Sequence, residues 1–207
     1  MVKSIIHVNP VTGKDSDTGD TVPFKTLTKA LSMATAGTTI HLAAGTYNAA
    51  RVEVFPLVIP KVVMVVGNKP TKGKDIVISG SGNYVSPTFN RQNITIRDSA
   101  APLIADNKIL GNPAGIVLMR QVQPVLRRNL IENNTHGGLV VNGRARPENG
   151  NSQDPAGNIL RNNGKADIQN SSCVRLVSLG NQLNRSRIEG PVELRSSQVP
   201  VRQTGSF

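Results

Sequence analysis

A short asparagine phrase recurs four times between residues 102 and 186. Its pattern is Asn-x-(Ile/Leu)-x-x-(Asn/Ser), and its leading asparagine returns after 22, 29 and 23 residues. Periods of this length are the sequence signature of proteins in which each repeat stacks on the next. The leading asparagines are Asn107, Asn129, Asn158 and Asn181, and the aliphatic positions are Ile109, Ile131, Leu160 and Leu183.

The phrase has the period of a strand rather than of a helix. Each copy sets one apolar residue between polar ones in a segment of a few residues. Asparagine suits the corner before a strand, because its side chain bonds nearby backbone and tolerates left-handed conformations. In stacked coils the leading asparagines would form a hydrogen-bonded ladder, and the aliphatic residues would form an internal column. Second strands are expected at 115–118, 138–141, 166–168 and 191–194.

These features predict an all-β fold, a right-handed parallel β-helix (solenoid) with one N-terminal capping α-helix. A β-sandwich with asparagine-rich turns is the alternative. The capping helix is expected over residues 24–35, where Phe24, Leu27 and Leu31 share a face, Pro23 suits the first turn and Gly37 ends it. It would cover the open end of the first coil. We expect one domain over 1–207, with the strand and helix cap in 1–37, coils in 38–194 and a tail in 195–207.

The charge of the chain changes character along its length. The net charge is +11, with 8 Lys and 3 Arg in residues 1–100 but 2 Lys and 11 Arg in residues 101–207. The planar guanidinium fork matches carboxylate, sulfate or phosphate better than an ammonium does. No run of five like charges and no interleaving of aromatic and basic residues occurs, so nucleic-acid binding is not favoured. Cys173 has no partner for an internal disulfide, and its aliphatic neighbours favour a buried, inert thiol.

Targeting signals give little guidance. No apolar run approaches the length of a membrane span, and residues 1–7 are too short and too polar for a signal peptide. We expect an extracellular or cell-surface protein whose signal is absent from this chain. A cytoplasmic location is the alternative.

Several segments resemble a known family. Val8-Asn-Pro-Val-Thr-Gly13, Pro23-Phe-Lys-Thr-Leu-Thr-Lys-Ala-Leu31 and Ala44-Gly-Thr-Tyr47 resemble the N-terminal signature of domain-of-unknown-function group 1565, from bacteria and notably cyanobacteria. Phe55-Pro-Leu-Val-Ile-Pro60 and Ile76-Val-Ile-Ser-Gly-Ser-Gly82 continue the match. The resemblance implies the pectin-lyase-like superfamily of right-handed parallel β-helices. It implies a fold and is nearly silent on chemistry.

The superfamily also implies which catalytic groups to seek. Its lyases use a basic residue beside a uronate carboxylate that Ca²⁺ neutralises, and its hydrolases use clustered aspartates. Here Asp98, Asp106, Asp154 and Asp167 are isolated from one another in the sequence. No catalytic residue and no cofactor is therefore predicted, and Ca²⁺ is the alternative.

Candidate metal ligands are few. Asp15, Asp17 and Asp20 lie close together and form a weak calcium candidate, but no Glu closes the loop as in helix-loop-helix calcium sites. A solvated turn is the other interpretation. His7 and His41 lie in apolar segments, which favours structural roles, and His136 lies in a third region, so the histidines show no metal-ligand spacing.

Arginines are the remaining candidates. Arg120 ends the strand of one coil, and Arg144 and Arg146 follow the equivalent strand of the next, so we expect them at one corner. The 29-residue coil is expected to insert about seven residues there, from Arg144 to Pro155, and such an insertion often walls a binding groove. Arg127 and Arg128 precede the asparagine phrase on a different edge. All five are candidate ligands for an acidic polysaccharide. Alternatively, they solubilise the solenoid, and some pair with Glu132, Glu148 or Asp154.

Three functions remain open. The first is a noncatalytic cell-surface or secreted module that binds or organises acidic polysaccharide. The second is a calcium-assisted polyuronate lyase, which a metal held by Asp98, Asp106 or Asp154 beside an arginine would favour. The third is a structural solenoid that assembles through an uncapped C-terminal end, which a homo-oligomer burying residues 195–207 would favour.

Overall fold

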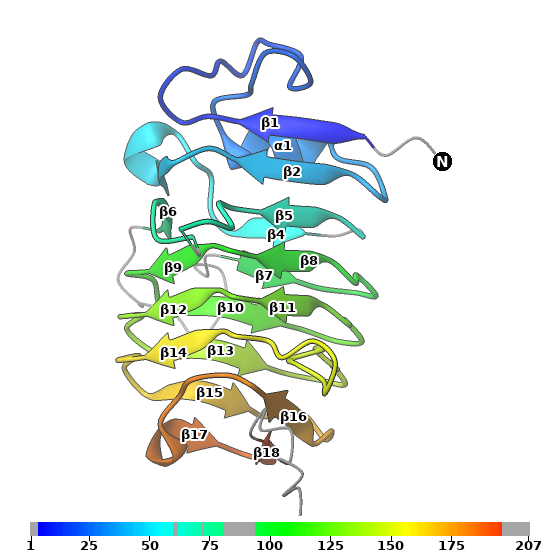
Figure 1. The fold of residues 1–207 in the computed structure, drawn as a ribbon, viewed down its shortest axis with the longest axis vertical. Helices are drawn as coiled ribbons and strands as arrows, with labels where there is room; N and C mark the ends of the chain where they lie inside the picture. Colours follow the sequence, from blue (N-terminus) through cyan, green and yellow to red (C-terminus); the bar gives the residue numbers. More distant parts are fainter. Residues whose placement is uncertain (1–3, 60–61, 72, 81–93, 196–207) are drawn as a thin grey trace, which may run out of the picture.

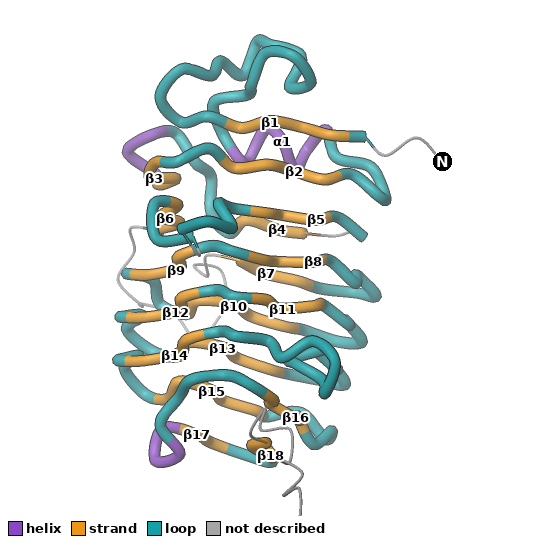
Figure 2. The backbone as a smooth tube through the Cα atoms, viewed as in Figure 1, coloured by secondary structure: helices purple, strands orange, loops and turns teal. Residues whose placement is uncertain are grey.

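Parallel β-strands dominate the computed structural model, which describes residues 4–59, 62–71, 73–80 and 94–195 (Figure 1). Figure 2 shows short strands separated by loops, with one α-helix near the N-terminal end and two short 3-10 helices, η1 (Ala49–Arg51) and η2 (Arg185–Arg187). Every strand pair among the described residues is parallel. The prediction of an all-β fold with parallel strands and one helix is confirmed.

The strands form three main sheets and a small fourth one. Sheet A contains β1 (Ile5–Val8), β2 (Thr39–Leu42), β5 (Met64–Val66), β8 (Leu103–Ala105) and β11 (Val125–Arg127). Sheet B contains β3 (Gly45–Asn48), β6 (Ile76–Ser79), β9 (Lys108–Leu110), β12 (Leu130–Glu132) and β14 (Ile159–Arg161). Sheet C contains β4 (Leu57–Ile59), β7 (Ile94–Ile96), β10 (Ala114–Leu118), β13 (Gly137–Val141), β15 (Ala166–Asn170) and β17 (Ile188–Glu189), and sheet D pairs β16 (Leu176–Leu179) with β18 (Val192–Arg195).

From β7 to β12 the chain visits sheets C, A and B in turn, twice, each time one level lower (Figure 1). After β13 the chain returns to sheet B at β14 and to sheet C at β15 without a further strand in sheet A. The repeat sets the register: Ile109 pairs with Ile131, and Ile131 pairs with Leu160. These three side chains are buried in one continuous core, while Leu183 of the fourth phrase is only partly buried against it. This stacking of parallel strands is consistent with a β-helix.

The leading asparagines are joined from coil to coil. The backbone N–H of Asn107 donates to Oδ1 of Asn129 at 3.2 Å, that of Asn129 to Asn158 at 2.9 Å, and that of Asn158 to Asn181 at 3.0 Å. The side-chain Nδ2 atoms donate to the same oxygens. The amides thereby satisfy corner backbone that would otherwise be buried without partners.

A second series follows the closing asparagines of the phrase. The Nδ2 atoms of Asn112 and Asn134 donate to Oδ1 of the next asparagine at 2.9 and 2.8 Å, and Nδ2 of Asn163 donates to Asp167 Oδ1 at 2.8 Å. The left-handed residue is the one before each asparagine, as at Asp106 and Arg128, whose φ values are 59° and 49°. The leading and closing asparagines of the phrase tolerate this conformation but do not adopt it themselves. The left-handed residue turns the chain, and the next side chain then points inward.

The helix is shorter than predicted. Helix α1 spans Leu27–Met33, with Thr26 as its N-cap and Ala34 as its C-cap in an extended conformation. Phe24 forms a parallel bridge with Val8 instead of opening the helix. Asp15 accepts hydrogen bonds from the backbone N–H groups of Lys25 and Thr26 at 3.0 and 2.9 Å. These contacts hold residues 24–26 extended, so apolar spacing alone placed the helix start too early.

The N-terminal end of sheet A is covered mainly by backbone pairing. Phe24 donates to the carbonyl of His7 at 2.9 Å, and Asn9 donates to the carbonyl of Phe24 at 2.8 Å. The loop before α1 therefore occupies the free edge of β1, while α1 packs against β1 and β4 (Figure 1). The buried carboxylate of Glu53 accepts from the N–H groups of Leu27 and Thr28 at the start of the helix, at 2.6 and 2.9 Å.

The last coil departs from the predicted order. The strand that continues the register of β15 is β17, because Ile168 pairs with Ile188. The strand expected at 191–194 forms β18, which pairs with β16 in sheet D. The prediction that this strand follows β15 in the stack is therefore wrong. The predicted tail lies outside the described residues beyond Arg195. None of the helices in the described part of the chain is long and apolar enough to cross a membrane.

Candidate functional site: an arginine corner

Three successive coils turn from sheet C to sheet A through the same backbone conformation. Asp98, Arg120 and Gly143 each follow a sheet C strand by two residues and have φ values of 68°, 66° and 70°. They stack because the strands before them are in register, with Leu118 paired to both Ile96 and Val141. A Cβ at Gly143 would lie 2.9 Å from the backbone N of Arg120. Glycine therefore lets the two coils approach closely at this corner.

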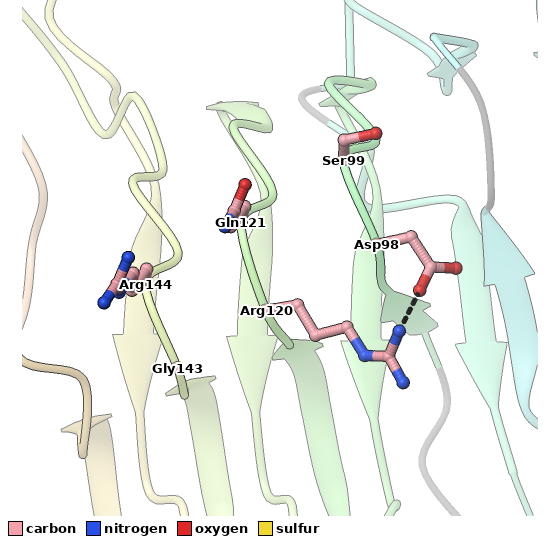
Figure 3. A pocket seen from close by; sticks show the side chains of 6 residues that line it. All are labelled: Asp98, Ser99, Arg120, Gln121, Gly143 and Arg144. Atoms are coloured by element: carbon pink, nitrogen blue, oxygen red, sulfur yellow. Dashed lines mark hydrogen bonds and ion pairs between the residues drawn. The ribbon is translucent and has the colours of Figure 1, made fainter.

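The stacked corner forms an open cavity of about 470 Å³ (Figure 3). The Nη1 of Arg120 donates to Oδ1 of Asp98 at 2.9 Å, and both side chains are largely exposed, at 73% and 50%. Arg144 is exposed on the next coil and makes no ion pair with the described residues. The lining residues are Asp98, Ser99, Arg120, Gln121, Gly143 and Arg144. The cavity thus holds one partly neutralised guanidinium and one that is open to solvent.

The positive surface continues along the coil of Arg144 and onto the coil after it. Arg146 is exposed, and its backbone N–H donates to the carbonyl of Val122 at 2.9 Å, which keeps it in register with the coil above. Arg146 and Arg175 line a second cavity of about 300 Å³. Arg175 has a distant partner in Glu193, at 3.7 Å. We call Arg120, Arg144, Arg146 and Arg175 the arginine corner.

Sequence reasoning missed Arg175. In the structure Val141 pairs with Asn170, and this offset aligns Arg175 with Arg146. The asparagine phrases do not reveal that offset, because 29 residues separate Asn129 from Asn158 but only 23 separate Asn158 from Asn181. Arg175 can be aligned with Arg146 only once it is known which corner of the long coil holds the extra residues.

Arg127 lies elsewhere, at the end of β11, and it is 5% exposed. Its Nε donates to Oδ2 of Asp154 at 2.7 Å, its Nη2 pairs with Glu148, and its Nη1 donates to the carbonyl of Leu126 at 3.0 Å. Its guanidinium is therefore occupied by two acids and the backbone. The structure does not bring Arg127 together with the arginine corner.

Arg128 is also paired with an acid. Its Nε and Nη2 donate to the two carboxylate oxygens of Asp106, both at 2.7 Å. These hydrogen bonds raise the pKa of Arg128 above its ordinary value, although partial burial opposes the shift. Asp106 itself is 1% exposed. This two-point pair joins one coil to the next at the corner between sheets A and B.

The extra residues of the long coil lie at that second corner. Arg144 and Glu148 keep the coil register, donating to the carbonyls of Arg120 and Pro124 at 2.7 and 2.8 Å. Val125 bridges to Glu148, whereas Leu130 pairs with Ile159. The insertion therefore falls between Glu148 and Gly157, and the prediction that it starts at Arg144 is wrong. It covers Arg127 and does not wall the cavity at Arg120 and Arg144.

Comparison with protein families gives one result. The chain matches the family described as protein of unknown function (DUF1565) over residues 11–97 and again over residues 86–188. The chain belongs to the DUF1565 family. No curated protein and no solved structure gave a match. Membership confirms the group that the sequence resembles, and it assigns no chemistry to the arginine corner.

In this DUF1565 protein the repeat-region aspartates are paired or buried. Asp98, Asp106 and Asp154 each contact a different arginine. Asp167 is buried and accepts from the N–H and the side chain of Asn163. Within 4–59, 62–71, 73–80 and 94–195, no three His, Cys, Asp or Glu side chains are close enough to hold a metal ion.

The N-terminal aspartates of the DUF1565 chain have separate surroundings. Asp15 binds the backbone before α1, and Asp17 donates its N–H to the carbonyl of Lys14 at 3.1 Å. Oδ1 of Asp20 accepts from the hydroxyl of Thr18 and from the N–H of Thr21. These hydrogen bonds, the Thr18 hydroxyl first, lower the pKa of Asp20 below its ordinary value. Two of the three calcium candidates thus use their carboxylates within the loop.

The cysteine of the DUF1565 chain is exposed, so the prediction of a buried thiol is wrong. Its N–H donates to the carbonyl of Gly143 at 3.4 Å, which places Cys173 in the same turn one coil below Arg144. Aliphatic neighbours in sequence did not imply burial, because Cys173 follows the end of β15 and lies in the turn before β16.

Proposed function

We propose that the chain is a right-handed parallel β-helix of the pectin-lyase-like kind that binds acidic polysaccharide at the arginine corner, as a noncatalytic module. We further propose that it acts at the cell surface or as a secreted protein. The observation that carries the proposal is the exposure of Arg144 and Arg146, which make no ion pair with the described residues. Unpaired guanidinium groups are strong ligands for carboxylate and sulfate groups.

The spacing of the corner favours a polymer over a small anion. Successive coils lie about 4.8 Å apart, because they are joined by strand pairing. Arg120, Arg144 and Arg175 belong to three successive coils, so a chain lying along the stack meets a new guanidinium at each level. The corner has two open cavities, whose linings meet at Arg144 and Ala145, rather than one enclosed pocket. Extended surfaces of this kind are how stacked-repeat proteins bind long ligands.

The chemistry of the corner favours saccharide over nucleic acid. The residues that line the 470 Å³ cavity include arginines, Ser99 and Gln121 but no aromatic side chain. Base stacking on aromatic rings contributes much of the affinity of proteins for single-stranded nucleic acid. Hydroxyl and amide groups instead suit the many hydroxyls of a sugar chain.

Retention on an immobilised polyuronate tests the proposal. The double variant Arg144→Ala/Arg146→Ala should elute at much lower salt than the wild type. A matched control, Lys69→Ala/Arg185→Ala, also removes two positive charges, but from exposed positions outside the corner. It should elute close to the wild type. If both double variants eluted at the same salt concentration, retention would depend only on the net charge of the protein. That result would overturn the proposed site.

Product formation separates binding from catalysis. Polyuronates incubated with the protein, with and without Ca²⁺, should give no rise in the ultraviolet absorbance of unsaturated uronates. A calcium-dependent rise in wild type that is lost in Arg144→Ala/Arg146→Ala would instead assign a lyase to the same corner.

A further inference from the structure

Two histidines face solvent side by side at the N-terminal end of sheet A. His7 of β1 and His41 of β2 are register partners, and their rings stack with centroids 5.7 Å apart and an interplanar angle of 22°. Both side chains are exposed. The sequence favours structural roles for them because their neighbours are apolar, yet strand alternation puts Ile6 and Val8 inside and the histidines outside. The polysaccharide site does not use this pair.

The ring nitrogens of the pair are available to a ligand. None of the hydrogen bonds and ion pairs found in the described part of the chain involves either imidazole. Partial burial and the neighbouring His7 lower the pKa of His41 below its ordinary value. A neutral imidazole has a lone pair on one ring nitrogen, which is the form that binds metal ions.

A carboxylate borders the same space. Asp20 lines a cavity of about 550 Å³ together with His7 and His41. Its loop is fixed beside β1, because the N–H of His7 donates to the carbonyl of Gly19 at 2.6 Å. Oδ1 of Asp20 is occupied within its own turn, whereas Oδ2 has no partner among the described residues. Asp20 therefore supplies a negative charge near the two imidazoles on a chain of net charge +11.

We propose that His7 and His41 bind a late first-row divalent cation, such as Zn²⁺ or Cu²⁺, with Asp20 providing the adjacent negative charge. Paired strands set the two residues about 4.8 Å apart. Two metal–nitrogen bonds of about 2.0–2.1 Å span roughly 4 Å at most, so a modest rotation of the exposed side chains brings both nitrogens onto one ion. Two protein ligands leave the remaining positions to water or to a ligand from solution.

The choice of cation follows from the donor set. Imidazole suits Zn²⁺, Cu²⁺ and Ni²⁺, with Cu²⁺ bound most tightly, whereas Ca²⁺ requires oxygen ligands. The site is thus distinct from the calcium interpretation of Asp15, Asp17 and Asp20. It lies on sheet A at β1 and β2, several coils from the arginine corner (Figure 1).

Calorimetric titration of the untagged protein with ZnCl₂ and CuCl₂ tests the site. Wild type should bind one equivalent. His7→Ala and His41→Ala should each weaken binding about tenfold or more, because each removes half of a chelating pair. Asp20→Asn should weaken it about two- to fivefold, as expected for an exposed charge. CaCl₂ should give no binding heat.

The third histidine provides the matched control. His136 lies in another part of the chain, between β12 and β13, so His136→Ala should bind as wild type does. In imidazole NMR spectra of the wild type, Zn²⁺ should shift the signals of His7 and His41 and leave those of His136 unmoved. Wild type without a saturable site, or an equal loss in His136→Ala and His7→Ala, would overturn the proposal.

Discussion

Arg127 and Arg144 lie one coil apart and have opposite surroundings. Arg127 is buried and holds Glu148 and Asp154, whereas Arg144 is exposed without an acidic partner among the described residues. The difference comes from the coil below each residue. Beneath Arg127 the next coil supplies Glu148 and its insertion supplies Asp154, while beneath Arg144 the turn supplies Cys173. An arginine in these stacked strands pairs with acids or stays exposed according to the partner that the next coil brings.

The same contrast applies to other polar groups. Asn129 and Glu132 are buried and bonded to neighbouring coils, so we expect them to contribute to stability. Arg144 and Arg146 are exposed, so we expect them to contribute to binding and little to stability. The variants below are ordered from the largest to the smallest expected loss of stability.

Arg127→Ala should have the largest effect, about 3 kcal/mol off the free energy of unfolding, because it leaves two acids and a carbonyl without their common donor. Urea unfolding measures it. The control is Arg120→Ala, whose pair with Asp98 is exposed and should cost at most about 1 kcal/mol. Equal losses in the two variants would break the distinction between inward and outward arginines.

Asn129→Ala should cost about 2 kcal/mol, because the buried N–H of Asn107 loses its acceptor. The same substitution at Asn181, at the half-buried end of the ladder, should cost about half as much, since water can replace the lost partners there. Thermal or urea unfolding of both variants gives the comparison. A larger loss at Asn181 than at Asn129 would contradict the account of the ladder.

Glu132→Gln should cost about 1 kcal/mol at neutral pH and less in acid. Burial raises the pKa of Glu132, but hydrogen bonds from Arg161 and Lys108 outweigh it and bring the pKa below the ordinary value. The stabilisation is therefore present above the unfolded-state pKa and is lost as pH falls through the lower folded-state pKa. The free energies of unfolding of wild type and variant should therefore converge as the pH is lowered. A difference that stays constant to low pH would exclude this ionisation as the cause.

Arg144→Ala/Arg146→Ala should change the free energy of unfolding by no more than about 0.5 kcal/mol, as exposed residues without partners do. The same protein should lose its retention on polyuronate. Destabilisation comparable to that of Arg127→Ala would show that the two outward arginines also hold the coils together.

The repeat made the coil register predictable. Ile109, Ile131 and Leu160 pair as the spacing of the phrases implies, because each buried apolar position must stack on its equivalent. The start of α1 could not be read in the same way. Phe24 has helical spacing with Leu27, but backbone hydrogen bonds to β1 and to Asp15 hold it and the next residues extended.

The candidate site was less predictable than the fold. The spacing of 29 residues shows that a coil is longer, but not at which corner, and Arg144 to Glu148 contains no strand marker that would fix the register. The sequence therefore does not show that the extra residues lie at the corner between sheets A and B. The partners of Arg127 depend on that placement, since Asp154 belongs to the inserted residues.

The most direct test of the central claim is a titration of the protein with a polyuronate oligosaccharide, followed by NMR of the arginine Nε–H groups. The account predicts that the signals of Arg120, Arg144, Arg146 and Arg175 shift with saturation, while those of Arg127 and Arg128 stay in place because acids already hold their Nε–H groups. The account would be contradicted if the signals of Arg127 and Arg128 shifted while the corner signals stayed in place. It would also be contradicted if no arginine signal showed a saturable shift.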